Sequence, residues 1–200
     1  MEAAPSPFSW SDAPRQGIGS FFRNIVEFIE QRGVKDRVLA EVSPDTRALC
    51  EKLPRSLSWV PSRHIDELEA AFLAVAGRQL TVQMGRDCSQ NLGTTLIQPV
   101  LRVAFSLLGQ GPATIFENLD RFFSVATRGI EFSYAPESKK AGIVTARFVG
   151  PDTPEAAFHV LQGSLEFIFE LCGVSGEVTT AEIAEESPKG ATVRYRVSWR

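Results

Sequence analysis

The residues best able to do chemistry are few and scattered. The chain has two histidines, His64 and His159, and three cysteines, Cys50, Cys88 and Cys172. None of them stands at the spacing of a zinc site, and neither a C-x-x-C pair nor an H-E-x-x-H motif occurs. We therefore expect no metal site and no disulfide framework, with the cysteines reduced as in a cytoplasmic protein.

The surroundings of His64 allow two interpretations. Asp66 and Glu67 follow it closely, and such a cluster could bind a metal ion. The simpler interpretation is an acidic first helical turn, stabilised by the helix dipole. His159 lies one position from an apolar stripe and is expected to be a satisfied or half-exposed histidine.

No nucleophile has the partners that catalysis requires. Arg86 stands two residues before Cys88, and a nearby cation can lower a thiol pKa, but Asp87 opposes that effect. A G-x-S-x-G elbow, a Walker phosphate loop and a dinucleotide G-x-G-x-x-G are all absent from the sequence. We predict no catalytic residues and a protein that is not an enzyme.

Composition excludes several classes of protein. The chain is 44% hydrophobic and 22% charged, which is ordinary for a globular protein. Its net charge of −3 and its lack of a basic run argue against a nucleic-acid partner. No apolar stretch approaches the roughly 20 residues of a membrane helix, so we expect no membrane insertion. Residues 1–17 lack the features of a secretory signal and are expected to form a flexible leader to a single domain over 18–200.

Phenylalanine is unusually frequent beside tyrosine, with 14 residues against two. Phenylalanine has no polar group, so such a surplus favours dry environments. Either a plain core or an apolar ligand pocket would satisfy this composition. If a pocket exists, we expect its lining to include Phe105, Phe122, Phe123, Phe132 and Phe158.

The elements that would position these residues change character halfway along the chain. Apolar residues recur at helical spacing over residues 21–29 and 65–75, and Ser43-Pro44 is a typical helix start. Further helices are expected over about 80–91, 95–108 and 112–123. Residues 57–61 form a bounded apolar piece that could be extended, because Pro61 disfavours helix before it.

Strand signals fill the second half, with one long helix between them. We expect strands at 130–134, 143–149, 178–185 and 191–199, a loop at 135–142, and a helix from Pro154 to Cys172. The predicted fold class is α+β: a helical N-terminal half, then α-ββ-α-ββ, with a four-stranded antiparallel sheet covered by helices. Gly163 lies inside the strongest helix, where close packing or a ligand passing over it would explain a residue that costs about 1 kcal/mol.

The end of the chain carries a family resemblance. The helix residues 159–168, Cys172-Gly173 and the terminal Arg194–Trp199 resemble the close of the 4-vinyl reductase domain. That superfamily includes the haem nitric-oxide-binding sensors and subunits of the transport-particle (TRAPP) complex. The order of Arg32-Gly33-Val34, Trp59-Val60-Pro61 and Gly85-Arg86 is also similar to an uncharacterised paralogous family of myxobacteria.

The resemblance implies a ligand-binding fold, often dimeric, with an apolar cavity between helices and sheet. It disfavours haem here, because Tyr134 and Tyr195 do not continue as the Tyr-x-Ser-x-Arg motif, and neither histidine stands just ahead of the first strand. We therefore expect no cofactor. Cys88 falls in the region where some transport-particle subunits carry an acylated cysteine, so it is a candidate pocket residue.

Two functions remain open at this stage. The first is a non-enzymatic sensor-type signalling domain, a cytoplasmic homodimer that binds a small apolar molecule near Gly163 and the phenylalanines. The alternative is a protein-interaction module that resembles transport-particle subunits and binds no ligand. An apolar cavity of several hundred cubic ångströms would favour the first function, whereas an exposed apolar patch would favour the second.

Overall fold

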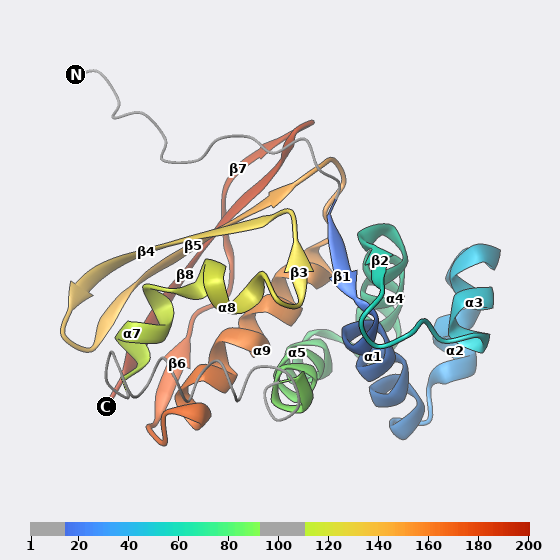
Figure 1. Cartoon of the computed structure of the whole chain (residues 1–200), viewed down its shortest axis with the longest axis horizontal. Coiled ribbons are helices and arrows are strands. Elements are labelled where there is room, and N and C mark those ends of the chain that lie inside the picture. Colours follow the sequence, from blue (N-terminus) through green and yellow to red (C-terminus); the bar gives the residue numbers. More distant parts are fainter. Residues whose placement is uncertain (1–14, 93–110) are drawn as a thin grey trace.

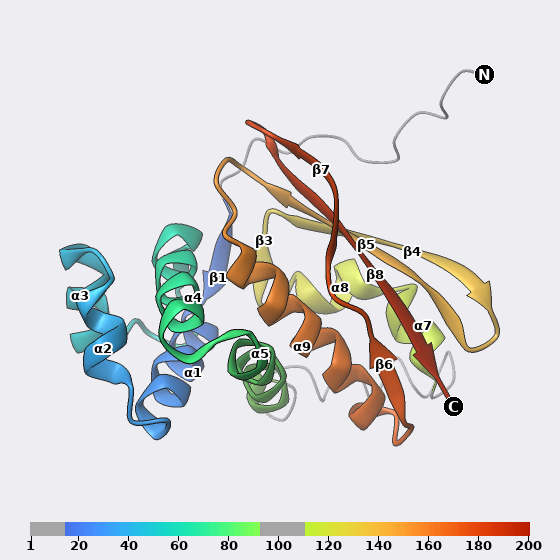
Figure 2. The ribbon, with the colours of Figure 1, turned by 180° about the vertical axis from the view of Figure 1, so that it is seen from behind.

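The computed structural model describes residues 15–92 and 111–200, and both views of the ribbon show a helical part beside a sheet-containing part (Figures 1 and 2). Phe8, Trp10, Phe105 and the helix expected over 95–108 lie outside the described residues. Within the described part, no helix is both long and apolar enough to cross a bilayer.

The first half is helical, as its periodicity predicts. Its helices are α1 (Gly19–Gln31), α2 (Lys35–Ala40), α3 (Pro44–Glu51), α4 (Ser62–Ala76) and α5 (Arg78–Leu92). Phe22, Ile25 and Ile29 form the buried stripe of α1. Ser43 begins α3 by accepting a hydrogen bond from the Thr46 amide at 3.3 Å, so the predicted cap is confirmed.

The helix expected over 112–123 is interrupted. Two short helices replace it, α7 (Pro112–Phe116) and α8 (Leu119–Phe123). The long predicted helix is α9 (Glu155–Leu171), and its N-cap residue is Pro154.

The main sheet is antiparallel and runs β4 (Ile130–Ser138), β5 (Ala141–Val149), β8 (Gly190–Trp199) and β6 (Gly176–Val178), with β7 (Glu182–Ser187) also paired to β8. The predicted α+β class is confirmed, but the sheet has five strands instead of four. The strand expected at 178–185 is broken between Val178 and Glu182, so its two pieces pair with different parts of β8.

The prediction of a loop at 135–142 was wrong. Strand β4 continues through Pro136, which pairs in register with Gly142, and an irregularity follows before Ser138. Proline is tolerated there because β4 is an edge strand, where a missing N–H breaks no ladder.

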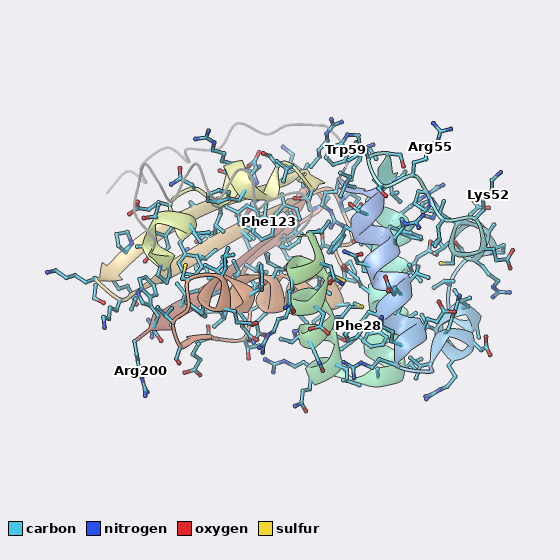
Figure 3. All side chains as sticks on the ribbon, turned by 60° about the horizontal axis from the view of Figure 1, so that its bottom comes forward. Phe28, Lys52, Arg55, Trp59, Phe123 and Arg200 are labelled. Carbon is cyan, nitrogen blue, oxygen red and sulfur yellow. The ribbon has the colours of Figure 1, made fainter. Side chains whose placement is uncertain are left out.

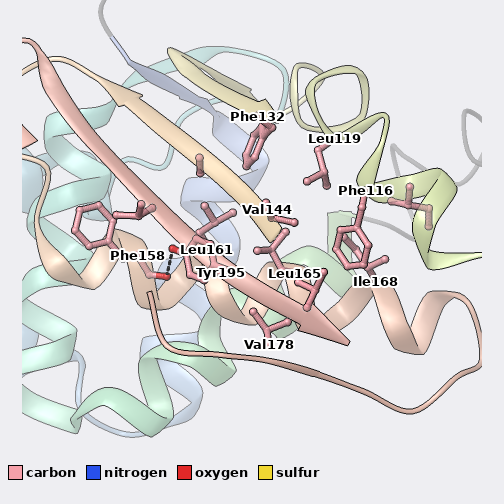
Figure 4. Close-up of a cluster of buried hydrophobic side chains, with 14 of the residues drawn as sticks. Phe116, Leu119, Phe132, Val144, Phe158, Leu161, Leu165, Ile168, Val178 and Tyr195 are labelled. Carbon is pink, nitrogen blue, oxygen red and sulfur yellow. Dashed lines mark hydrogen bonds between the residues drawn. The ribbon is translucent and has the colours of Figure 1, made fainter. Parts of the chain in front are cut away.

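Strand β8 shows the clearest match between pattern and burial. Val193, Tyr195 and Val197 are fully buried, and the residues between them are exposed or half-buried. The Tyr195 hydroxyl donates a hydrogen bond to the Phe158 carbonyl of α9 at 2.8 Å, drawn as the dashed line in Figure 4. This bond ties the sheet to the helix that covers it.

A small second sheet joins the two halves of the chain. It contains β2 (Trp59–Pro61), β1 (Gln16–Ile18) and β3 (Thr127–Arg128) in that order. Its central strand comes from residues that the sequence assigns to the flexible leader and the start of the domain. The extended piece expected at 57–61 contributes the edge strand β2.

Helix α9 is the centre of the molecule. It lies between the main sheet and α5, and most of its residues are buried (Figures 1 and 2). One core cluster joins α7, α8, α9 and the sheet, whereas a second joins α1 to α5 and includes Val160 of α9. The boundary between these two cores is where a ligand site could form.

Candidate functional site

An apolar cavity of about 130 Å³ lies at the boundary between the two halves. Its walls come from the small sheet, from α1, α4 and α5 on one side, and from α7, α8, β5 and α9 on the other. The volume is below the several hundred cubic ångströms of a drug-sized site, but it is similar to apolar cavities of about 150 Å³ that hold benzene. The cavity therefore suits a ligand with about one aromatic ring.

The apolar walls include side chains from nearly every element around the cavity. They are Phe21, Ile65, Leu92, Ile115, Phe122, Phe123, Ile130, Phe148, Leu161, Phe167, Ile168 and Leu171.

The structure divides the predicted phenylalanines into lining residues and supporting residues. Phe122 and Phe123 of α8 line the cavity, and Figure 3 labels Phe123 between the ribbons of α8 and α9. Phe132 and Phe158 belong to the core behind that wall. Phe132 packs on Phe123 with ring centroids 4.7 Å apart, and Phe158 packs on the lining residue Phe148 at 5.2 Å.

Gly163 contacts a helix instead of the cavity. A Cβ atom at Gly163 would collide with the Val82 carbonyl oxygen of α5, and a Cβ at Gly85 would collide with the Val160 carbonyl oxygen of α9. The two glycines therefore let the backbones of α5 and α9 approach closely. The sequence predicted a close approach of this helix to the sheet or to another subunit, or a ligand passing over Gly163, whereas the close approach is to helix α5.

Cys88 lies in the neighbouring core, and its side chain is 1% exposed. Burial, reinforced by the negative charge of Asp87, raises the pKa of its thiol well above the ordinary value. A thiol that stays protonated is a poor nucleophile. The cavity wall next to it is made by Ser89 instead.

Both histidines belong to local hydrogen-bonded groups outside the cavity wall. His64 Nδ1 lies 2.7 Å from Thr46 Oγ1, and burial lowers the pKa of its imidazole. His159 Nε2 lies 3.2 Å from Glu155 of the same helix, and burial likewise lowers its pKa. The described residues contain no group of three or more histidines, cysteines and carboxylates that could hold a metal ion.

A buried ion pair closes one side of the cavity. Arg15 donates to both carboxylate oxygens of Asp66, at 3.3 and 2.7 Å, and its guanidinium lies 5.6 Å from the centre of the Phe148 ring. Arg15 is 7% exposed. The sequence analysis missed this pair because it treated residue 15 as part of a leader, and the two partners lie 51 residues apart.

Glu69 of α4 is the polar group that stands out among the lining residues. Its side chain is 3% exposed and, in the described structure, makes no hydrogen bond or ion pair. Burial, reinforced by the negative charge of Asp66, raises the pKa of the Glu69 carboxyl well above its ordinary value, and Arg15 opposes this effect. An uncompensated buried carboxylate is very costly, so the surroundings of Glu69 favour its protonated form.

A signal for Glu69 was present in the sequence. The apolar face of α4 carries Ile65, Leu68 and Phe72, and Glu69 stands four residues after Ile65 on that same face. A carboxyl at a core position of an amphipathic helix is rare enough to indicate a functional site. The two interpretations given to the acidic residues near His64, a metal-binding cluster and an acidic helix start, did not extend to Glu69.

No family model matches the sequence, and no curated protein matches it. The fold, however, is shared with solved H-NOX structures. A Fe(II) unliganded H-NOX protein from K. algicida is 10% identical with a TM-score of 0.62, covering 92% of this chain and 96% of its own. An oxygen-binding H-NOX domain related to soluble guanylate cyclases, in its oxygen complex, is 10% identical with a TM-score of 0.61, covering 91% and 94%.

A third structure comes from work on haem redox potential and protein-induced porphyrin distortion. It is 10% identical with a TM-score of 0.61, covering 90% of this chain and 99% of its own. These likenesses show that the chain shares the fold of the haem-nitric-oxide-binding (H-NOX) structures. The prediction of no cofactor, with haem disfavoured, was wrong, because the fold is one whose solved members are haem proteins.

The residues around the cavity fit haem only in part. The walls are apolar, as the faces of a porphyrin require, but the volume of about 130 Å³ is that of about one aromatic ring. The described lining includes no histidine, cysteine, methionine or tyrosine, the usual ligands of haem iron. The sequence of residues 93–110 contains none of these residue types either. The residues present thus provide no axial ligand at this cavity, and no step of a mechanism is assigned to a haem iron.

Proposed function

We propose that this chain is a sensor-type domain that binds a small, mainly apolar ligand in the cavity between its helical half and its sheet. The observation that carries the proposal is the cavity itself, whose walls are apolar and come from both halves of the molecule. A ligand seated there would contact both core clusters at once. Its binding could therefore change how the two halves pack, which is what a sensor requires.

The absence of a catalytic group supports binding over catalysis. The cavity-lining residues that the structure describes include no histidine and no cysteine, the side chains that most often act as a general base or as an activated nucleophile. Solved structures of this fold include an Fe(II) unliganded H-NOX protein and an oxygen-binding H-NOX domain, which supports a sensor function by analogy of fold. The finer resemblances, to vinyl reductases, transport-particle subunits and a myxobacterial family, stay predictions, as do cytoplasmic location and a homodimer.

The interaction-module alternative has less support on the described surface. Three large apolar side chains are exposed there, Leu53, Leu57 and Ile183. Leu53 and Leu57 lie between α3 and β2, whereas Ile183 is on β7 of the main sheet. Isolated exposed apolar residues are normal and do not make an interface.

The test fills the cavity with a larger side chain on α9. Ala157 lines the cavity, and Ala157→Leu should occupy much of the space of a ring. Ala74→Leu on the exposed side of α4 is the matched control. Binding of toluene and of haemin would be measured for each protein, by thermal shift with native mass spectrometry and by absorption titration respectively.

We expect saturable one-to-one binding of at least one probe to the unaltered protein and to Ala74→Leu, and its loss in Ala157→Leu. Binding that Ala157→Leu leaves unchanged would place the ligand elsewhere and overturn the proposal. No binding of either probe to any protein would also count against it.

A further inference from the structure

The cavity wall carries a carboxyl group without a partner, and its chemistry points to a class of ligand. Glu69 lines the cavity, is 3% exposed and has no hydrogen-bond or salt-bridge partner among the described residues. Buried polar groups in folded proteins are normally paired, so a buried carboxyl without a partner requires an explanation. A ligand that supplies the missing partner is such an explanation.

The other charged groups around the cavity, and the Ser164 hydroxyl, are already engaged. Asp66 is paired with Arg15 at 2.7 Å. The Ser164 hydroxyl donates to the carbonyls of Val160 and Gly85, at 3.0 and 3.3 Å. Arg128 lies 3.9 Å from the centre of the Trp59 ring, on the small sheet. Compared with these groups, Glu69 is thus the one available to bind a polar atom of the ligand.

The charges near Glu69 determine which polar atom it would accept. Asp66, on the same helix, is the negative charge that acts on Glu69. Arg15 is the cation that acts on Glu69, but its guanidinium is committed to Asp66. The surroundings therefore favour a positive or hydrogen-donating group on the ligand and disfavour an anion.

We propose that Glu69 is the recognition residue for a small aromatic amine, whose ring fills the apolar cavity and whose ammonium group pairs with the Glu69 carboxylate. The inference rests on the proposed function, since it names the ligand class for the same cavity. A volume of about 130 Å³ limits the apolar part to about one ring. A charge-assisted hydrogen bond in a dry site then supplies specificity that the apolar walls cannot.

Binding of an amine to Glu69 should release a proton. Burial raises the pKa of the Glu69 carboxyl in the free protein, which favours its protonated form, and the amine is a cation in neutral solution. Formation of the ion pair therefore releases the Glu69 proton to the solvent, one proton for each amine bound. A hydrocarbon of the same shape would bind without releasing a proton.

The experiment compares three ligands of matched shape: benzylamine, toluene and benzoate. Their affinities would be measured by isothermal titration calorimetry in two buffers that differ in ionisation enthalpy, which reports the protons released. The variants are Glu69→Gln and Glu69→Leu. Glu51→Gln, at an exposed position on α3, is the control for loss of a carboxyl.

We expect the unaltered protein and Glu51→Gln to bind benzylamine about tenfold or more tightly than toluene, with release of close to one proton, and to bind benzoate weakest. Both Glu69 variants should lose this preference and the proton release, while Glu69→Gln still binds toluene.

Equal binding of toluene and benzylamine by the unaltered protein would overturn the role of Glu69 and leave the apolar cavity standing. An amine preference that persists in both Glu69 variants would overturn it as well. Failure of all three ligands to bind would count against the cavity as a ligand site.

Discussion

The two sides of α9 differ sharply in how they are packed. On the side facing α5, Gly85 and Gly163 allow backbone to contact backbone, and Ser164 bonds across the contact to the Gly85 carbonyl. Where α9 lines the cavity, larger side chains such as Leu161 and Ile168 leave space unfilled. Small residues thus let the backbones of α5 and α9 touch, whereas large apolar residues such as Leu161 and Ile168 leave unfilled space at the cavity.

This difference indicates which part of the molecule is a scaffold and which part could respond to a ligand. A close-packed contact tolerates almost no change in volume, whereas a cavity wall has room to relax. The α5–α9 contact would hold the two halves together while a ligand binds in the cavity or leaves it.

The largest effect on stability is expected from adding side-chain volume at the contact between α5 and α9. Replacing both glycines, Gly85→Ala with Gly163→Ala, should lower the free energy of unfolding by about 4–6 kcal/mol, because each new Cβ collides with backbone. Chemical denaturation measures this change.

Gly111→Ala is the control, since a Cβ there meets nothing within 4 Å, and its effect should stay below about 1 kcal/mol. Helix propensity alone predicts that alanine at both positions would stabilise the protein by about 1 kcal/mol each. A double variant that is more stable than the unaltered protein would show that the backbones of α5 and α9 do not approach each other this closely.

A smaller effect should distinguish a core leucine from a cavity leucine on α9. Leu165 is fully buried in the sheet-side core, and Leu165→Ala should cost about 3 kcal/mol. Leu171 is half-buried and already borders the cavity, so Leu171→Ala should cost about 1 kcal/mol.

Thermal and urea unfolding of the two leucine variants would measure the difference. The same leucine-to-alanine change is made in both, so each serves as the control for the other. Equal costs at the two positions would mean that the cavity is no less packed than the core.

The smallest effect concerns the pH dependence of stability. The folded state raises the pKa of the Glu69 carboxyl above its ordinary value of 4.5, so the folded protein retains a proton that the unfolded chain loses. Stability should therefore fall as pH rises above about 4.5, until the folded pKa is reached. Glu69→Gln lacks this loss and should be the more stable protein at neutral pH.

Urea unfolding over a series of pH values would measure the difference between the two proteins. Asp66 and Glu166 also have pKa values raised by burial, but they titrate in both proteins and cancel in the comparison. At about pH 4 the two proteins should differ little. A difference that does not depend on pH would mean that Glu69 is solvated or paired.

Several features followed from the sequence because they depend on local pattern. The alternation of Val193, Tyr195 and Val197 identified the buried face of β8, and the Ser43-Pro44 start of α3 was located correctly. The division into a helical half and an antiparallel sheet followed from the change of period along the chain. The phenylalanine surplus indicated dry surroundings, and Phe122 and Phe123 do line the cavity.

Other features required contacts between distant residues. The pairing of Arg15 with Asp66 spans 51 positions, and the partner of Gly163 is the Val82 carbonyl of another helix. Phe132 and Phe158 had the same composition signal as Phe122 and Phe123, but they lie behind the wall. Periodicity assigns a residue to a face of its element and does not say which element that face meets.

The sequence by itself thus determined the fold class, the order of most elements and the general dryness of the interior. Only the tertiary structure decided that the space between the halves is a cavity, and that Glu69 stands at its wall without a partner. The physical reason is that hydrophobic burial acts without direction and is encoded in local pattern. A cavity and the satisfaction of a buried charge depend on how several elements meet in space.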